Sequence, residues 1–255
     1  MIKFFRKIRQ RLLTENKITA YLIYALGEIL LIVIGILFAL AISNSNEKSK
    51  QEAQELGYLE SLKNDLSISI EELDKYIKTR ENRIISAKRI LEHFDGKPIE
   101  DLEAFNLDIA NIYSWRKYFQ NNNTYQELIN SGKFALISNN SIKNTLLNLE
   151  TLYKKLKDEE SHFRYDSEVL LYEPSYEMVD HHLVVENYKY HLSNGQIGSK
   201  LPFKRAQFEA MLLDLKQTNG FAMSILEFEI MNQLFEDMKQ MSKALIQLVD
   251  KEIEN

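Results

Sequence analysis

The sequence predicts an all-α protein, in which an N-terminal transmembrane helix is followed by an antiparallel bundle of long helices. Turn-forming residues are scarce, with 8 Gly and 3 Pro among 255 residues, and this favours long helices over a many-stranded β fold. Residues 18–42 carry a single charge, and residues 56–94 repeat apolar side chains in heptads without a proline. We therefore expect a basic cytoplasmic arm over 1–17, a transmembrane helix over 18–43 and an extracytoplasmic helical bundle over 44–255.

The first 17 residues are basic and amphipathic. Six Lys or Arg residues face Glu15 alone, a side-chain balance of +5, and they surround one apolar helical face. We expect a short helix lying on the anionic surface of the inner leaflet; the alternative is a solvated basic tail that only sets the topology. The residues expected at the membrane surface are Lys3, Arg6, Lys7, Arg9 and Arg11.

Residues 18–42 are long enough to cross a membrane, since about 20 apolar residues span a bilayer core. Basic residues cluster before this stretch and are mixed with acidic ones after it. The expected protein therefore crosses the inner (cytoplasmic) membrane once, with a cytoplasmic N-terminus and a periplasmic main domain. A cleaved signal peptide is the alternative, because residues 39–41 read Ala-Leu-Ala, but a 41-residue signal with a central charge exceeds the usual length.

Glu28 is the one charge inside this stretch. A charged carboxylate at that depth costs up to roughly 3 kcal/mol, so it should find a partner, protonate or reach the headgroups. It shares one helical stripe with Gly35 and Ala39, whose small side chains allow close helix approach. We expect Glu28, Gly35 and Ala39 to form an interface with another membrane helix; the alternative is a carboxylate tolerated alone near the headgroups.

Two stretches carry a family resemblance. FFRKIRQRLLTENK (4–17) with YALGEILLIVIGILFALAISN (24–44) is one, and TYQELINSGKFALISN (124–139) is the other. They resemble an uncharacterised Bacteroidota family of single-pass, membrane-anchored helical proteins, a domain of unknown function with a basic arm and a Gly-Glu-Ile within the span. The family usually has a Trp after the span, where this chain has Asn-Ser-Asn-Glu (44–47), so an outer aromatic anchor is not expected. The resemblance implies membrane anchoring and helical structure, and no activity.

The heptad register runs from Leu56 to Phe94. Its a and d positions are apolar except at Lys63 and Arg80. We expect one long helix here, continuous with the span through the polar stretch 44–55 and ended by Asp-Gly-Lys-Pro at 95–98. It could be a dimeric stalk or the first helix of a bundle within one chain, and later amphipathic segments favour the bundle.

Four further helices are expected along the chain. The first covers 101–119, and a capping box of Thr124 with Glu127 opens a short second one that ends at Ser131-Gly132. A longer helix starts near Ser141 and continues to about Tyr172.

The last helix, about 221–253, is the natural antiparallel partner of the first. Its stripe is expected to be core, although Met-rich faces also occur at adaptable binding surfaces. The stripe consists of Met231, Leu234, Met238, Met241, Leu245 and Leu248. Before it, the helical period fails between Val184 and Leu201, where alternating Tyr188, Tyr190 and Leu192 precede Asn-Gly. This stretch is either a small β-hairpin or a loop.

No pattern in the sequence points to catalysis. There is no cysteine, so disulfides and thiolate metal sites are excluded, and no catalytic residue or cofactor is expected. The cluster Asp180-His181-His182 is not expected to bind a metal, because adjacent His side chains diverge by about 100° on a helix. Tyr113, Trp115 and Tyr118 are expected to anchor the core and less so to line a pocket. The part after the arm sums to −10, which makes nucleic acid a poor partner.

The leading functional hypothesis is a membrane-anchored, non-catalytic interaction or scaffold protein that self-associates through its transmembrane helix. Its partners would be the lipid bilayer and either a second copy or another membrane protein. The alternative is an extracytoplasmic ligand-sensing helical bundle that signals through a separate membrane partner. A defined pocket with convergent polar groups would favour ligand sensing, whereas a broad exposed apolar patch would favour the scaffold.

Overall fold

The computed structural model of the chain describes residues 7, 10 and 18–254, and every regular element in this part is helical. The chain divides into two compact units, residues 1–57 and 58–255. Helix α2, Ile18–Phe94, passes through the boundary without a break. The predicted all-α class is therefore confirmed, and so is the continuity of the span with the first long helix.

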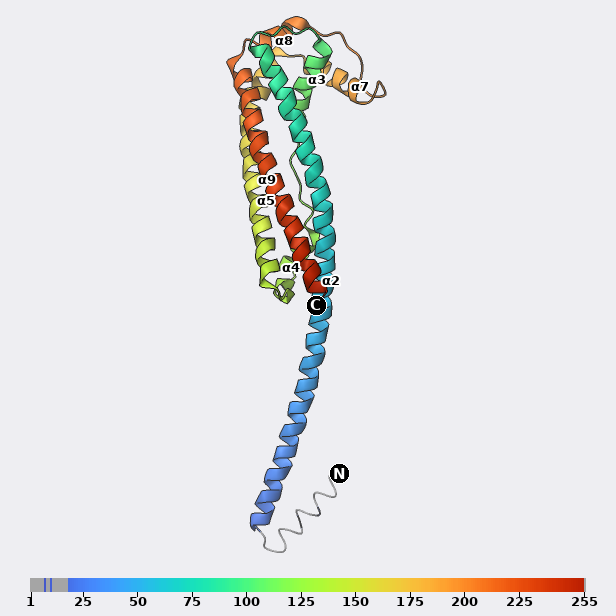
Figure 1. Cartoon of the computed structure of the whole chain (residues 1–255), viewed down its shortest axis with the longest axis vertical. Coiled ribbons are helices and arrows are strands. Elements are labelled where there is room, and N and C mark those ends of the chain that lie inside the picture. The colour runs from blue at the N-terminus through green and yellow to red at the C-terminus, as the bar shows by residue number, and fades with distance from the viewer. Residues whose placement is uncertain (1–6, 8–9, 11–17, 255) are drawn as a thin grey trace. The chain divides into compact units, whose positions relative to one another are not determined.

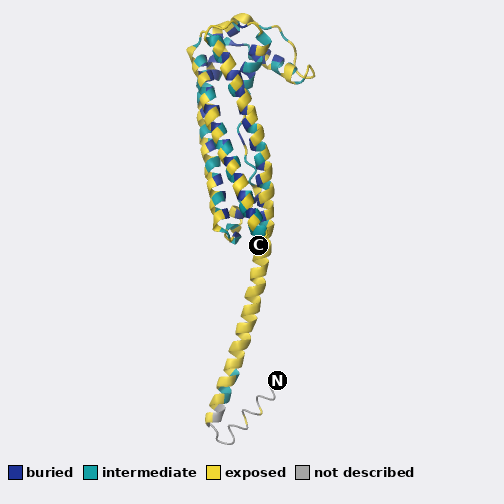
Figure 2. Cartoon of the chain, viewed as in Figure 1, coloured by how far each residue is buried: buried dark blue, intermediate teal, exposed yellow. Residues whose placement is uncertain are grey.

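The described part of the first unit is the N-terminal portion of α2. It contains the candidate membrane span, whose most apolar 18-residue window has a mean hydropathy of 2.8 and no buried residue. Figure 2 shows this portion exposed along most of its length. Length and composition thus identify one helix, among the described residues, that is able to cross a membrane. The polar stretch 44–55 is also helical and almost wholly exposed.

The second unit is built on three long helices (Figure 1). They are the part of α2 from Tyr58 onward, α5 (Asn140–Ser167) and α9 (Leu215–Ile253). Ion pairs between α2 and α9 show that these helices are antiparallel, because the partner numbers fall as the α2 numbers rise. The pairs are Lys63–Asp250 (2.5 Å), Asp74–Lys239 (2.8 Å) and Lys88–Glu229 (3.6 Å).

Helix α5 is also antiparallel to α9. The Asn139 amide donates to Glu252 at 2.6 Å near one end, and His162 Nδ1 lies 3.0 Å from Glu227 Oε1 further along. Helices α2 and α5 therefore run in the same direction, and α9 runs in the opposite direction. The predicted antiparallel bundle within one chain is confirmed.

The segment 114–122 is not helical and runs along α2, although the sequence predicts helix as far as residue 119. Helix α3 covers only Leu102–Tyr113, so the predicted helix 101–119 was wrong in its last turns. Polar side chains of α2 bind backbone carbonyls along this path: Arg83 binds those of Asn111 and Ser114, and Ser69 binds that of Asn121. These bonds satisfy carbonyl groups that a helix would otherwise pair internally.

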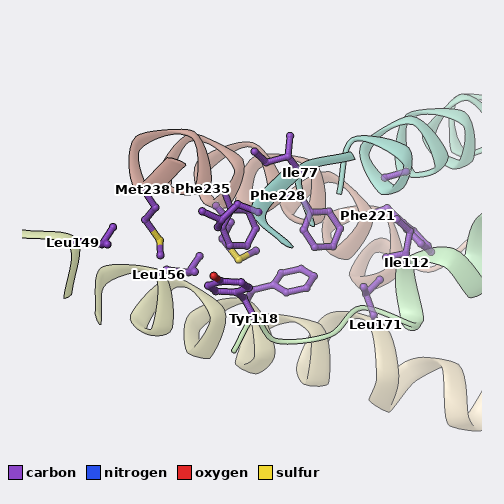
Figure 3. Close-up of a cluster of buried hydrophobic side chains, with 14 of the residues drawn as sticks. Ile77, Ile112, Tyr118, Leu149, Leu156, Leu171, Phe221, Phe228, Phe235 and Met238 are labelled. Atoms are coloured by element: carbon purple, nitrogen blue, oxygen red, sulfur yellow. The ribbon is translucent and has the colours of Figure 1, made fainter. Parts of the chain in front are cut away.

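The core between the long helices is rich in aromatic rings (Figure 3). Tyr118 packs edge-on against Phe235 at 5.4 Å between ring centroids and against Tyr76 at 5.1 Å. Both Met231 and Met238 are almost completely buried, so the Met stripe of α9 is core, as expected. Its partners Leu234, Met241 and Leu248 are only partly buried, because the centre of the buried face also includes Ser224, Phe228, Phe235 and Ser242.

Short helices form a head at one end of the long ones. They are the π-helix η2 (Glu168–Tyr172), α6 (Glu173–Met178), α7 (His181–Leu192) and α8 (Arg205–Met211), together with α3. The hairpin suggested for 188–201 is wrong, because Tyr188, Tyr190 and Leu192 belong to α7. The buried Asn187 amide explains this, since it donates to the carbonyl of Leu201 and accepts from its N–H, which ties the following loop back onto the helix.

At the other end of the long helices lie α4 (Asn123–Asn130) and the 3₁₀-helix η1 (Lys133–Leu136). The predicted capping box is wrong, because Asn122 is the N-cap residue and the Thr124 N–H donates to Asp65 on α2 at 2.8 Å. Gly132 ends this element as predicted, with a φ of 70° that favours glycine.

Candidate functional site

The head contains a largely apolar cavity of about 130 Å³ between α3, α6, α7 and α8. Most of its walls are aliphatic or aromatic, and a few polar groups from three helices converge on it. It is lined by Ile109, Ala110, Tyr113, Ser114, Ser175, Val179, His181, Val184, Val185, Tyr188 and Met211.

Tyr113 connects the cavity to the first turn of α9. Its hydroxyl lies 3.0 Å from the carbonyl oxygen of Leu171 and 3.0 Å from Gln217 Oε1. The Gln217 amide in turn donates to the carbonyls of Leu170 and Leu171 in the π-helix. Burial raises the pKa of the Tyr113 phenol above its ordinary value, so it stays protonated and acts as a donor. This network fixes one wall of the cavity.

Ser175 and His181 form a second hydrogen-bonded pair at the cavity. The Ser175 hydroxyl donates to the carbonyl of Tyr172 at 2.9 Å, and His181 Nε2 lies 3.0 Å from Ser175 Oγ. Because the single hydroxyl hydrogen is used, Nε2 must carry the proton and donate to Ser175. Burial lowers the pKa of His181, so the ring is neutral at pH 7 and its Nδ1 is a hydrogen-bond acceptor.

Tyr188 offers a second acceptor at the cavity. Ser114 Oγ donates to the carbonyl of Asn111 at 3.2 Å, and it lies 3.3 Å from the hydroxyl oxygen of Tyr188. Tyr188 therefore donates to Ser114, and its own oxygen can still accept. An apolar cavity with two acceptors suits a small apolar ring that carries a hydrogen-bond donor.

The residues of the predicted membrane interface lie on α2 in the first unit. Ala39 is exposed, Glu28 is half-buried, and a Cβ placed on Gly35 would meet no atom within 4 Å. The surface at Gly35 is therefore open to close approach, as the prediction requires. Association through Glu28, Gly35 and Ala39 stays a prediction.

Four of the residues predicted at the membrane surface, Lys3, Arg6, Arg9 and Arg11, lie outside the described residues. Lys7 is helical and exposed. The expected interfacial helix over the arm therefore also stays a prediction.

The cluster at 180–182 divides among three roles. Asp180 is the N-cap of α7, where it accepts from the Leu183 N–H, and it also pairs with Lys204. His181 faces Ser175 at the cavity, and His182 is exposed. The three side chains therefore do not converge.

A buried ion pair links α2 to α5. Its Arg80 is one of the two charged residues at the a and d positions of the heptad register. Arg80 Nη2 lies 2.9 Å from Glu160 Oε1, and the two side chains are 1% and 0% exposed. Burial lowers the pKa of Arg80 to about 10, against the opposing charge of Glu160. The guanidinium also lies over the Phe235 ring at 4.5 Å, and Glu160 accepts from the Tyr118 N–H at 2.7 Å. The pair therefore joins α2 to α5 inside the core of the bundle.

Long packed helices, a cavity-bearing head and, among the described residues, one helix able to cross a membrane define a helical-bundle protein with a candidate membrane span. Residues 28–170 match the model of the Family of unknown function (DUF6090). The match covers more than half of the chain, so the chain belongs to this family. No curated protein and no solved structure matches it. The matched part includes α3 on one wall of the cavity but ends before α6, α7 and α8.

Proposed function

We propose that this protein is a membrane-anchored, non-catalytic ligand-binding protein, whose head takes up a small, mostly apolar molecule with one hydrogen-bond donor. The observation that carries the proposal is the cavity of about 130 Å³ with its converging polar groups. An apolar cavity of about 150 Å³ holds a molecule the size of benzene. Phenol-like or indole-like rings are therefore of the right size and polarity.

Two features support binding over a simple packing defect. Protein interiors contain few voids larger than a water molecule, and the rest of this core is a continuous cluster of buried aliphatic and aromatic side chains. In addition, Tyr113, Ser175 and Ser114 are each held by backbone carbonyls, so the polar groups around the cavity have fixed orientations. Preformed sites of this kind lose little entropy on binding.

The Ser175–His181 pair does not support catalysis. A nucleophilic serine must give its proton to a base, whereas the Ser175 hydroxyl donates to a carbonyl and accepts from the imidazole. We therefore assign His181 a role in ligand recognition.

The span would hold this domain on the periplasmic face of the inner membrane, with the N-terminus in the cytoplasm. Ligand occupancy would be passed to a second copy or another membrane protein through the Glu28, Gly35 and Ala39 stripe. The open surface at Gly35 supports such contact. The same stripe supports the second candidate function, a scaffold that self-associates without a ligand.

Cross-linking of the full-length protein in lipid tests association through this stripe. Gly35→Ile should weaken association most, because it blocks close approach, and Glu28→Leu should weaken it by about 1 kcal/mol. Glu28→Gln, which keeps the shape and much of the hydrogen bonding, should preserve it. Equal association of all three variants and the parent would remove the stripe from the proposal.

The ligand itself is sought by extraction. Full-length protein is purified from membranes in mild detergent, denatured, and the released small molecules are identified by mass spectrometry. Ala110→Leu, which fills the cavity, should lose the bound molecule. Ala135→Leu makes the same change at an exposed position and should keep it. If both variants release the same molecules as the parent, the cavity is not the binding site.

A further inference from the structure

A second group of functional side chains lies on the long helices, away from the head. Glu159 and His162 come from α5, and Glu227 comes from α9. One ligand-type atom from each of the three lies within 4.8 Å of the other two. Imidazole nitrogen and carboxylate oxygen are both common ligands of divalent transition metals.

The helix geometry brings these residues together. Glu159 and His162 are three residues apart, so they lie on the same face of α5. Helices α5 and α9 pack antiparallel side by side (Figure 1). This face of α5 meets α9 at Glu227, because His162 Nδ1 lies within hydrogen-bond distance of the Glu227 carboxylate. Rigid helices hold all three side chains, and a site built on helices is more precisely positioned than one built on loops.

The spacing suits coordination of one ion. His162 Nδ1 and Glu227 Oε1 are 3.0 Å apart. Two ligands at about 2.0–2.2 Å from a zinc ion, separated by a roughly tetrahedral angle, are about 3.3–3.6 Å apart. A shift of a few tenths of an ångström would therefore convert this hydrogen-bonded pair into two ligands of one metal.

The burial of the Glu227 carboxylate is a second, independent observation that favours a bound cation. Its side chain is only 4% exposed, and its second oxygen, Oε2, is buried without a hydrogen-bond partner among the described residues. A buried carboxylate with an oxygen that lacks a hydrogen-bond partner is costly unless a positive charge compensates it.

Access to the site is open on one side. The His162 side chain is 58% exposed, so an ion can enter from solvent and retain water as a further ligand. Three protein ligands with an open position are the arrangement in which Zn²⁺ keeps a bound water.

We propose that Glu159, His162 and Glu227 bind one divalent transition-metal ion, with Zn²⁺ favoured over Mn²⁺ and Fe²⁺ by the general order of affinities. The ion fastens α5 to α9. Since it binds the folded chain, it raises the stability of the bundle with increasing concentration.

The test uses full-length protein in detergent, purified without a histidine tag and stripped with a chelator. Zn²⁺ is titrated by calorimetry, and Co²⁺ is added as a probe because its visible absorption reports the ligand geometry. We expect one ion per chain and a rise in the melting temperature. His162→Ala, Glu159→Gln and Glu227→Gln should each lower the affinity at least tenfold.

His182→Ala is the matched control, because it removes an exposed histidine from another helix, and it should bind Zn²⁺ as the parent does. His162→Ala changes an exposed side chain and should fold normally, which circular dichroism checks. The proposal is overturned if no ion binds at one per chain, or if His162→Ala and His182→Ala bind with equal affinity.

Discussion

The long-helix region and the head of the second unit are both built from apolar and aromatic side chains, but the first has a filled core and the second encloses a cavity. Between α2, α5 and α9, apolar residues recur every three or four positions, and rings such as Tyr118 and Phe235 fill the space between the helices. In the head, α3, α6, α7 and α8 are short and meet without a shared repeat, and a cavity is left among them. A long repeat lets ridges and grooves interlock over many turns. Short helices fixed by caps and side-chain hydrogen bonds can enclose a space and still be rigid.

The buried polar groups of the two regions also differ, because those of the long helices pair with each other and those of the head surround the cavity. In the long-helix region the buried charges Arg80 and Glu160 compensate each other inside the core. In the head, Tyr113, Ser175 and His181 are neutral and are placed around the cavity. The first arrangement specifies how helices pack, and the second prepares a surface for something outside the protein.

The largest expected effect comes from breaking the buried ion pair. Glu160→Leu leaves the Arg80 charge buried and unpaired, which should lower the free energy of unfolding by about 3–5 kcal/mol. The double variant Arg80→Met, Glu160→Leu removes both charges and should recover much of this loss. Chemical unfolding of the full-length protein in detergent, followed by circular dichroism, measures both. If the double variant is no more stable than the single one, burial of the Arg80 charge is not the source of the loss.

The same substitution in each region tests the difference in packing directly. Ala87 is completely buried between the long helices and Ala110 lines the cavity. Ala87→Leu should overpack the core and cost about 1–3 kcal/mol, whereas Ala110→Leu has room and should be neutral or stabilising by about 0.5–2 kcal/mol. Thermal melts of the two variants are compared with the parent. Equal destabilisation would mean that the head is packed as densely as the long-helix region.

Two glycines test how closely the head and α9 approach. A Cβ at Gly220 would lie 2.5 Å from a Leu171 methyl carbon in the π-helix, whereas a Cβ at Gly57 would meet nothing within 4 Å. Gly220→Ala should therefore destabilise by about 1–3 kcal/mol. Gly57→Ala should stabilise by roughly 0.5–1 kcal/mol, because alanine is the better helix former. A stabilising Gly220→Ala would show that the π-helix is mobile enough to move aside.

The smallest expected effect is a pH dependence that belongs to the head. Burial lowers the pKa of His181, while an unfolded histidine titrates near about 6.5. Below that pH the unfolded chain binds a proton that the folded chain resists, so the contribution of His181 makes stability fall as the pH drops through this window. His181→Gln should flatten the slope and His182→Gln, at an exposed position, should leave it unchanged. An unaltered slope in His181→Gln would place the titration elsewhere.

Sequence periodicity predicts the long-helix region well and the head poorly. The heptads of 56–94 and the stripe of α9 follow from one repeated physical rule, burial of every third or fourth side chain. The end of α3 could not be predicted in this way, because its carbonyls are satisfied by Arg83, a residue distant in sequence. Alternation at Tyr188 to Leu192 suggested a strand, whereas the Asp180 cap and the Asn187 bonds to Leu201 hold a helix.

The sequence predicts only part of the candidate site. Tyr113 and His181 are candidates by residue type, but the aliphatic lining residues, such as Ile109 and Val184, have the same pattern as other core residues. Their grouping depends on how α3 and α7 meet, and no repeat encodes that. Glu159 and His162 were likewise inconspicuous until α9 placed Glu227 beside them.

The central claim, that the head cavity binds a small apolar molecule with a hydrogen-bond donor, is tested most directly by methyl NMR of the full-length protein in detergent with phenol as the probe. Phenol should shift the methyl signals of Ile109, Val179 and Val184 saturably, and leave those of Ile90 and Ile142 in the long-helix core unchanged. Ala110→Leu should abolish the shifts. Unsaturable shifts, or shifts of equal size in both regions, would contradict a binding site in the head.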